Sequence, residues 1–338
     1  MVWGAYQGQL NDAKSYLESG AQPSHILVLN EPNLRGQAFI TPQASADWMK
    51  QVHTTLSPYG IPLVGPQMSL GSSVEDSITA WDPILEREVT YTDMNTFLDA
   101  YNYYVEDGLT EGIAVHPYGG VGEMQWAVNS AYDRSGEPVW VTEFAYWSAG
   151  SVDELYDYMI LALDYLEHSP RVARYAWFKA DLGSRGRLSL LSTDQTELSR
   201  LGELYVSYPV YDPDYYYPVN TRIEAEAYLD KTTSMQMQTS DIEGGMGALF
   251  NSRSFGWADY QIHIEETGIY TVRLRISNDS YPELLEPVNT RVENPAVGIE
   301  RDLLMTTELE AGQQTLRIWF KRLGAKFDWF EVLPGARK

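Results

Sequence analysis

The fold of this chain depends most on one short run, Ile26-Leu27-Val28-Leu29-Asn30-Glu31-Pro32. Four apolar residues in a row, rich in branched side chains, are typical of a strand that is buried on both faces, as in parallel sheets. Pro32 has no N–H to donate to a neighbouring strand, so we expect the strand to end there. Asn30 and Glu31 then lie at its carboxyl end, which is the end that carries the chemistry in α/β barrels.

A second run, residues 138–144, has the same form and ends in Glu143 and Phe144. Two carboxylates brought to one rim by two strand ends can serve as the acid and as the nucleophile or base of glycosidic bond cleavage. A single Glu at a strand end is more often an ion-pair partner or a cap. The pair favours catalysis because further polar and aromatic residues occur on the neighbouring strands, namely Asn30, His116, Tyr118 and Trp177.

The amino-acid composition restricts the classes of molecule that this protein can bind. A formal net charge of −23 over 338 residues argues against nucleic acid, because a phosphate binder needs a basic face, and it suits a neutral polysaccharide. No apolar run approaches the roughly 18 residues of a membrane span, and we see no signal peptide. There are no cysteines, and the five histidines are dispersed, so we expect no disulfide and no metal-dependent catalysis. The 24 Tyr and 10 Trp suit sugar stacking or core packing equally.

Strands and helices alternate through the first 200 residues. We expect helices at residues 11–19, 42–57, 93–106 and 151–169, and strands at residues 1–4, 26–32, 61–68, 112–118, 138–144 and 172–178. This alternation predicts an α/β domain over residues 1–204 whose parallel strands close as a (β/α)8 barrel. Six strands are visible where a barrel needs eight. We therefore expect a barrel that lacks its first two strands, and the alternative is an open barrel.

The residue composition and periodicity of the sequence change after that domain. Residues 205–221 are rich in Tyr and Pro without periodicity and are interpreted as a linker. Short alternating runs follow over residues 222–335, and the clearest of them start at Tyr260, Tyr270 and Thr315. These runs predict an all-β antiparallel sandwich of the jelly-roll kind.

The first domain resembles glycoside hydrolase family 128. The motifs that carry the resemblance occur in family order, and they are Met1-Val-Trp-Gly, Leu29-Asn-Glu-Pro-Asn-Leu-Arg-Gly-Gln, Ala114-Val-His-Pro-Tyr-Gly, Val139-Trp-Val-Thr-Glu-Phe and Arg174-Tyr-Ala-Trp-Phe. The resemblance implies a secreted, retaining endo-β-1,3-glucanase in which Glu31 is the acid/base and Glu143 is the nucleophile. It also implies that two strands precede the Met1 motif.

The same resemblance gives the remaining residues their expected roles. Asn30 would bind the sugar 2-hydroxyl, His116 and Tyr118 would orient Glu143 or the sugar, and Trp177 would stack beneath the cleavage point. Trp3 and Trp147 complete the expected substrate-binding set. Three alternatives stay open: His116 only caps its strand, Trp177 belongs to the core, and Trp147 only covers the rim.

The second domain resembles carbohydrate-binding module family 6. The matching residues are Ile223-Glu-Ala-Glu-Ala-Tyr, Gly244-Gly, Gly256-Trp-Ala-Asp-Tyr, Gly268-Ile-Tyr-Thr-Val-Arg-Leu-Arg, Ala311-Gly-Gln-Gln-Thr-Leu-Arg and Phe327-Asp-Trp-Phe. The likeness makes Glu224, Glu226 and Asp328 candidates for a structural calcium ion, with Arg222 as the alternative counter-charge. Glu224 and Glu226 are two residues apart in an expected strand, so we expect their side chains to share one face. Phe250, Trp257 and Lys326 are the candidates for sugar binding by this domain.

Together these observations lead us to expect a monomeric, extracellular or periplasmic hydrolase of β-1,3-glucan that uses two Glu residues and no catalytic cofactor. Two alternatives remain. The chain could be a non-catalytic polysaccharide-binding fragment, or it could cleave another polysaccharide such as agarose.

Overall fold

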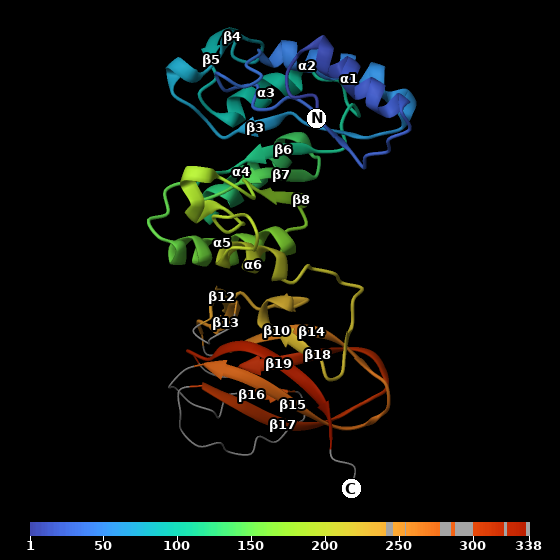
Figure 1. The fold of residues 1–338 in the computed structure, drawn as a ribbon, viewed down its shortest axis with the longest axis vertical. Helices are drawn as coiled ribbons and strands as arrows, with labels where there is room; N and C mark the ends of the chain where they lie inside the picture. The colour runs from blue at the N-terminus through green and yellow to red at the C-terminus, as the bar shows by residue number, and fades with distance from the viewer. Residues whose placement is uncertain (241–245, 254, 278–284, 288–299, 321–322, 336–338) are drawn as a thin grey trace. The chain divides into compact units, whose positions relative to one another are not determined.

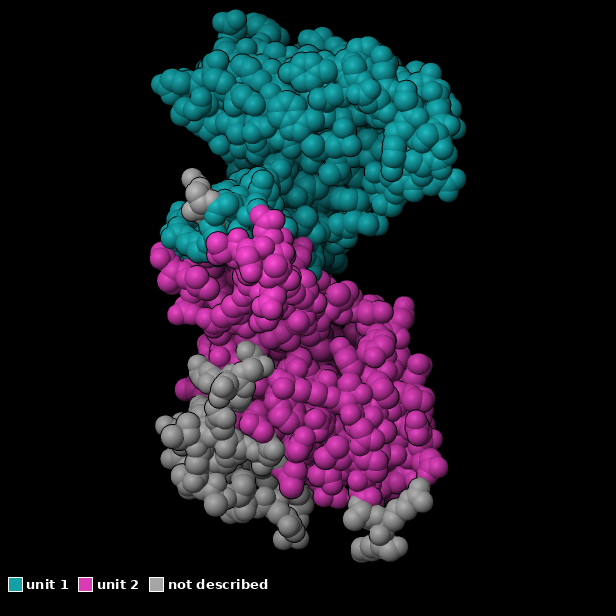
Figure 2. Space-filling model, in the orientation of Figure 1, with its two compact units in different colours: residues 1–149, 169–189 teal, residues 150–168, 190–338 magenta. Residues whose placement is uncertain are grey.

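The computed structural model describes residues 1–240, 246–253, 255–277, 285–287, 300–320 and 323–335. The chain divides into two compact units, which are coloured in Figure 2. The first unit comprises residues 1–149 and 169–189, and the second comprises residues 150–168 and 190–338. The Gly244-Gly245 pair lies outside the described residues.

Short parallel strands form the centre of the first unit. Two of them pair with each other, β1 (Ile26–Leu27) and β2 (Leu63–Val64), and a four-stranded sheet follows in the order β3 (Gln67–Ser69), β6 (Ile113–His116), β7 (Val139–Phe144) and β8 (Val172–Trp177). Figure 1 shows β6, β7 and β8 side by side. Parallel bridges from Val2 to Val28 and from Asn30 to Gln67 extend this row toward the N-terminus.

The six expected strand segments therefore lie in chain order and run parallel, which confirms a mixed α/β domain. Within the part of the chain that the structure describes, no ladder joins β8 to the Val2 segment. Closure of these strands into a barrel stays a prediction.

Four α-helices accompany these strands: α1 (Gln7–Glu18), α2 (Pro42–Leu56), α3 (Met94–Tyr104) and α4 (Val121–Ser135). The expected start of α2 is confirmed, because the Thr41 side chain accepts a hydrogen bond from the Ala44 N–H and Pro42 is the first helical residue. No side-chain signal marks the start of α4, because its N-cap is Gly120, which has no side chain to bond the first turn. A hairpin of β4 (Thr79–Asp82) and β5 (Arg87–Thr90) was not expected either.

The core of the first unit lies between the early strands and the helices. Val2, Val28 and Leu29 are fully buried, as are Met49 and Val52 from α2. Burial of such a side chain contributes about 1.5–3 kcal/mol. This packing holds the residues around Asn30 and Glu31 against the rest of the unit.

The second unit contains α5 (Val152–His168), α6 (Arg200–Ser207) and most of the β-structure. Its larger sheet has the order β12 (Met235–Thr239), β13 (Gly247–Asn251), β19 (Lys326–Pro334), β15 (Gly268–Ser277) and β17 (Glu300–Leu309), with β10 (Arg222–Glu224) also paired to β19. The other sheet has the order β11 (Asp230–Lys231), β14 (Gly256–Ile264), β18 (Gly312–Phe320) and β16 (Leu285–Pro287), with β9 (Tyr217–Pro218) beside β14. A sheet-rich C-terminal region is thus confirmed, whereas the jelly-roll topology stays a prediction.

One expectation about this unit is wrong. Glu224 and Glu226 were expected to share one face of a strand, but β10 ends at Glu224 and Glu226 lies in a 3-10 turn, Ala225–Ala227. The turn carries Glu226 to a buried position, while Glu224 stays beside Arg222. Among the described residues, no helix is long and apolar enough to span a bilayer.

Candidate active site

The chain leaves regular strand geometry where it delivers Glu31. Leu29 and Glu31 have positive φ angles of 56° and 45°, which are unusual for residues with a side chain. Two hydrogen bonds hold this backbone, from Glu31 N–H to the Gln67 carbonyl at 2.7 Å and from Asn30 N–H to the Trp3 carbonyl at 2.8 Å. Such conformations cost about 1–3 kcal/mol and are concentrated at functional sites.

The strand that delivers Glu143 is irregular as well. The register of β7 against β8 pairs Val141 with Tyr175 and Phe144 with Trp177, so β7 holds one more residue than β8 in this interval. An extra residue of this kind breaks the alternation of side chains and redirects them. Thr142 and Glu143, although adjacent in sequence, therefore both reach the same partner.

That partner is His116, at the end of β6. Its side chain is completely buried. Nδ1 lies 3.0 Å from Glu31 Oε1 and 3.6 Å from Glu143 Oε2, and Nε2 lies 2.9 Å from the Thr142 hydroxyl. One imidazole thus joins the two carboxylates that the sequence singled out.

Tyr118 holds Glu143 from another direction. Its hydroxyl donates a hydrogen bond to Glu143 Oε2. Burial, and then this hydrogen bond to Glu143, raise the pKa of Tyr118 well above its usual range, so it stays a neutral donor. The Tyr118 ring lies 5.3 Å from that of Trp147 and 5.8 Å from that of Phe178, which builds an aromatic wall beside the carboxylate.

The other expected substrate residues differ in their placement. The Asn30 amide donates to Gln37 Oε1 at 3.0 Å, and Trp3 is its backbone neighbour and is half-buried. Trp177 is only 6% exposed, its N–H donates to the Leu188 carbonyl at 2.8 Å, and it packs edge-on against Phe144. These contacts of Trp177 suit the core alternative better than stacking on a sugar.

Three residues near the carboxylates were missed by sequence reasoning: Thr142, Gln37 and Phe178. Strict alternation along β7 would place Thr142 on the face opposite Glu143, so the pattern argued against it. Gln37 follows a turn whose direction depends on the positive φ angles before it. Phe178 follows directly after Trp177, which was the residue predicted to stack on the sugar. Only the Thr-Glu pair in the family-like motif carried a usable signal.

The sugar-binding candidates of the second unit do not gather at one place. Phe250 and Lys326 face each other across β13 and β19 in the larger sheet. Trp257 lies in the other sheet, where the Arg317 guanidinium stacks 3.7 Å from its ring centroid. The structure therefore brings together two of these three residues.

The three carboxylates that were candidates for calcium, those of Glu224, Glu226 and Asp328, suit such a site only in part. Glu226 is 1% exposed, and its Oε1 accepts a hydrogen bond from the Gly247 N–H while Oε2 has no hydrogen-bond partner. Asp328 is fully buried near Glu226, and burial raises the pKa of both carboxyls, to about 8 for Glu226. Buried oxygens of this kind are what a hard cation needs.

Glu224 fits calcium less well, because Arg222 lies 2.7 Å from its Oε1. Arg222 also approaches Asp328 Oδ2 at 4.0 Å, which makes it the alternative counter-charge. In the described parts of the chain, no group of three or more His, Cys, Asp or Glu side chains is arranged to hold a metal ion. Calcium therefore stays a prediction, with Glu226 and Asp328 as its best-placed ligands.

Comparisons with known proteins identify a family of glycosyl hydrolases. The family model "Glycosyl hydrolase catalytic core" matches residues 1–205. A family 128 (subgroup II) endo-β-1,3-glucanase from Sorangium cellulosum is 30% identical, with a TM-score of 0.50 over 63% of this chain and 80% of that chain. A second such enzyme, from Pseudomonas viridiflava, is 29% identical, with a TM-score of 0.49 over 62% of this chain and 79% of that one.

A curated relative matches a shorter region. Alkali-sensitive linkage protein 1 of Schizosaccharomyces pombe is 36% identical over 104 residues, which are 28% of this chain and 19% of that protein. The match thus spans less than a fifth of the curated relative. From the family model and the first of the solved structures, we conclude that this chain belongs to the glycosyl hydrolase catalytic core family and carries a catalytic domain of glycoside hydrolase family 128.

Proposed function

We propose that this chain is a retaining glycoside hydrolase that cleaves β-1,3-glucan, with Glu31 as acid/base and Glu143 as nucleophile. The observation that carries the proposal is the convergence of both carboxylates on Nδ1 of His116, at 3.0 and 3.6 Å. The choice of β-1,3-glucan follows the Sorangium cellulosum relative, which is an endo-β-1,3-glucanase.

The spacing of the two carboxylates is compatible with retention. The two carboxylate oxygens cannot be farther apart than the sum of their distances to His116 Nδ1. Retaining enzymes hold their carboxyl groups about 5–5.5 Å apart, whereas inverting enzymes hold them about 6.5–9.5 Å apart to admit a water molecule. Two carboxylates that share one nitrogen suit the shorter spacing.

Each carboxylate has partners that suit its role. An Nδ1–H of His116 would donate to Oε1 of Glu31, so the catalytic proton of Glu31 would sit on Oε2 and pass to the glycosidic oxygen. Oε2 of Glu143 accepts from Tyr118, which leaves Oε1 to attack the anomeric carbon. The C–O bond to the leaving sugar breaks as the bond to Glu143 forms.

The second step reverses the roles. Glu31, now ionised, removes a proton from a water molecule that attacks the anomeric carbon and releases Glu143. Asn30 would bind the sugar 2-hydroxyl through its carbonyl oxygen, because its amide nitrogen already donates to Gln37. The wall of Tyr118, Trp147 and Phe178 would contact the sugar ring next to Glu143.

A polysaccharide substrate also implies where the enzyme acts and what it binds. A glucan polymer does not cross a bilayer, so the enzyme would act outside the cytoplasm. We propose that it acts as a monomer, and that the β-rich region assists polysaccharide binding through Phe250 and Lys326, which are neighbours across β13 and β19.

The test is hydrolysis of laminarin by the purified chain, with the anomer of the first product followed by NMR. We expect the β-anomer to form first, and we expect no product from the Glu143→Gln variant. The α-anomer as first product would indicate inversion. Binding of laminarin without hydrolysis would favour the polysaccharide-binding alternative, and cleavage of agarose instead would change the substrate.

A further inference from the structure

The loop that follows β3 offers a surface that the proposed catalytic residues do not use. β3 ends at Ser69, which is paired with His116 across the two parallel strands. The chain then runs through residues 70–93 before α3 begins, and this interval contains the strands labelled β4 and β5 in Figure 1. Loops at the carboxyl ends of parallel strands carry the binding sites of α/β enzymes. The β4–β5 hairpin therefore belongs to the end of the sheet that presents Glu31 and Glu143.

The base of the hairpin is bonded to the segment that follows Glu31. The Leu34 N–H donates to the Glu31 carbonyl at 3.0 Å, and Leu34 forms an antiparallel bridge with Ser77. Trp81 follows Ser77 by four residues, in β4. A turn, one bridge and four extended residues place Trp81 within about 25 Å of Glu31 along the backbone. A glucan chain bound at the two carboxylates can span such a distance with a few sugar residues.

One face of the hairpin combines an indole ring with hydrogen-bonding groups. In the register of the two strands, Trp81 lies opposite Glu88, and Thr79 lies opposite Thr90. The two threonine hydroxyls are 2.8 Å apart, so these four side chains share one face. Trp81 is 58% exposed, more than any other tryptophan of the chain. Trp has an apolar body and a polar tip, which suits a ligand that is apolar on one side and wet on the other.

The rest of the hairpin holds this face in place. The Asp82 side chain is buried, and its Oδ1 accepts hydrogen bonds from the N–H groups of Ile84 at 2.9 Å and Leu85 at 2.8 Å. Its Oδ2 accepts a hydrogen bond from the Tyr91 hydroxyl at 3.3 Å. Tyr91 is fully buried and packs edge-on against Phe97 of α3. The exposed face thus stands on a fixed support, which lowers the ordering cost of binding.

The indole of Trp81 is not used by the fold in the way that other indoles are. An Arg174 guanidinium covers Trp140 at 5.1 Å, and an Arg317 guanidinium covers Trp257 at 3.7 Å. Within the described parts of the chain, no aromatic ring or guanidinium packs on the Trp81 indole. A large exposed apolar group on a rigid loop beside a reactive centre marks a binding surface.

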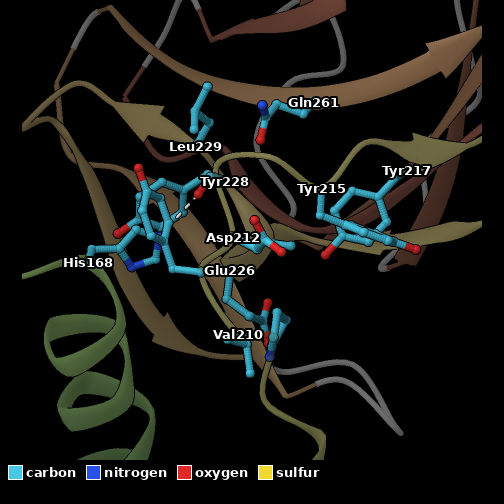
Figure 3. Close-up of a pocket in the computed structure, with 12 residues that line it drawn as sticks. His168, Val210, Asp212, Tyr215, Tyr217, Glu226, Tyr228, Leu229 and Gln261 are labelled. Atoms are coloured by element: carbon cyan, nitrogen blue, oxygen red, sulfur yellow. Dashed lines mark hydrogen bonds between the residues drawn. The ribbon is translucent and has the colours of Figure 1, made fainter. Parts of the chain in front are cut away.

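The pocket of the second unit drawn in Figure 3 is, by contrast, too small for an organic ligand. It lies beside the His168–Tyr228 stack and the Tyr215–Tyr217 pair, and it has room for about one water molecule. Both ring nitrogens of His168 already face backbone carbonyls, those of Asp164 and Tyr228.

We propose that the Trp81 face of the β4–β5 hairpin is a distal sugar site, which binds the glucan chain beyond the cleavage point. This inference rests on the glucanase function proposed above. The indole stacks on the apolar face of a sugar ring, and the Thr79 hydroxyl and the Glu88 carboxylate bond the hydroxyl groups around it. A protein partner is less suitable, because a stable interface covers about 800 Å² on each side and this face consists of two four-residue strands.

The test is calorimetric titration of the full chain carrying Glu143→Gln, which stops turnover, with laminarin and with laminaritriose. The trisaccharide is expected to occupy only the sites next to the carboxylates, whereas laminarin is long enough to reach the hairpin as well. We expect Trp81→Ala in this background to weaken binding of laminarin about tenfold and to leave binding of laminaritriose unchanged. Trp81→Phe keeps an aromatic ring and should retain part of the affinity for laminarin. Any binding of laminarin by the second unit is common to all variants.

Trp126→Ala is the matched control, because Trp126 is also exposed, at 41%, but lies on α4 and not on the hairpin. We expect this variant to bind both sugars as the Glu143→Gln chain does. Thermal midpoints measured in parallel check that each variant is folded.

Three results would overturn the distal site while the glucanase function stands. They are unchanged binding of laminarin by Trp81→Ala, an equal loss in Trp126→Ala, and an equal loss for laminaritriose. If the Glu143→Gln chain with Trp81 intact bound neither sugar, the proposed function and the distal site would both be wrong.

Discussion

Replacing Thr142 with valine would test whether its hydroxyl positions His116 between the two carboxylates. The change keeps the branched shape of the side chain and removes the oxygen that lies 2.9 Å from His116 Nε2. Because the His116 side chain is completely buried, no solvent can replace that oxygen. Leaving a buried polar atom without its partner costs about 1–3 kcal/mol.

If the imidazole no longer stays aligned with Glu31 and Glu143, the enzyme should stabilise the transition state less, by a similar free energy. A loss of about 1–3 kcal/mol corresponds to a fall in kcat of about 5- to 150-fold. The assay is the initial rate of laminarin hydrolysis over a pH series, with the thermal midpoint of each variant measured in parallel. Because Thr142 would act by fixing which imidazole nitrogen carries the proton, we expect the pH profile to change shape as well.

Thr142→Ser is the matched control, because it removes only the methyl group and keeps the oxygen. We expect this variant to retain most of the wild-type rate and the wild-type pH profile. A purely structural role for Thr142 would lower the rate equally at every pH. The reasoning would be refuted by a valine variant that keeps both the rate and the pH profile of the wild type.

Three further predictions follow from the same contacts. Glu143→Gln should abolish the glycosyl-enzyme seen by mass spectrometry, whereas Glu31→Gln should slow substrates with poor leaving groups and be rescued by azide on activated ones; rescue of the Glu143 variant alone, with retention, would reverse the roles. Burial raises the pKa of Glu226 from 4.5 to about 8, so between these values the native state holds a proton that the unfolded state has lost, and stability should fall as the pH rises through this window. Thermal midpoints in chelator should show that Glu226→Gln removes this fall, and parallel curves for the two proteins would contradict it. If Glu226 and Asp328 bind calcium, a hundredfold excess of calcium over its Kd should stabilise the folded chain by about 2.7 kcal/mol and so raise the thermal midpoint. An unchanged midpoint would leave Arg222 as their counter-charge.

The sequence by itself determined much of the first unit, because the signals there are local. Short, mostly apolar runs predicted the strands that end near His116, Glu143 and Trp177. The Thr41-Pro42 pair predicted the start of α2, since a capping oxygen and a fixed φ act within one turn. Where such a signal was absent, as at Gly120, the helix was missed. The two candidate carboxylates were found for a local reason too, because each follows an apolar run.

Only the tertiary structure decided how those carboxylates meet. The positive φ angle of Glu31 and the extra residue in β7 break the two-residue period on which sequence reasoning relies. Both depend on pairing with neighbouring strands, and so does the approach of Thr142 to His116. Similarly, the turn that buries Glu226 is not visible in the alternation of residues before it.

The linker-like segment illustrates the same limit in the second unit. Its Tyr- and Pro-rich composition predicted the absence of a regular period, and composition could go no further. The place of this segment depends on contacts of Tyr211 with His168 and of Pro213 with Gln261, which are distant in sequence. Local sequence patterns specify which elements form, because capping and periodicity act over a few residues. The meeting of side chains from different elements depends on register, turns and packing, which exist only once the chain has folded.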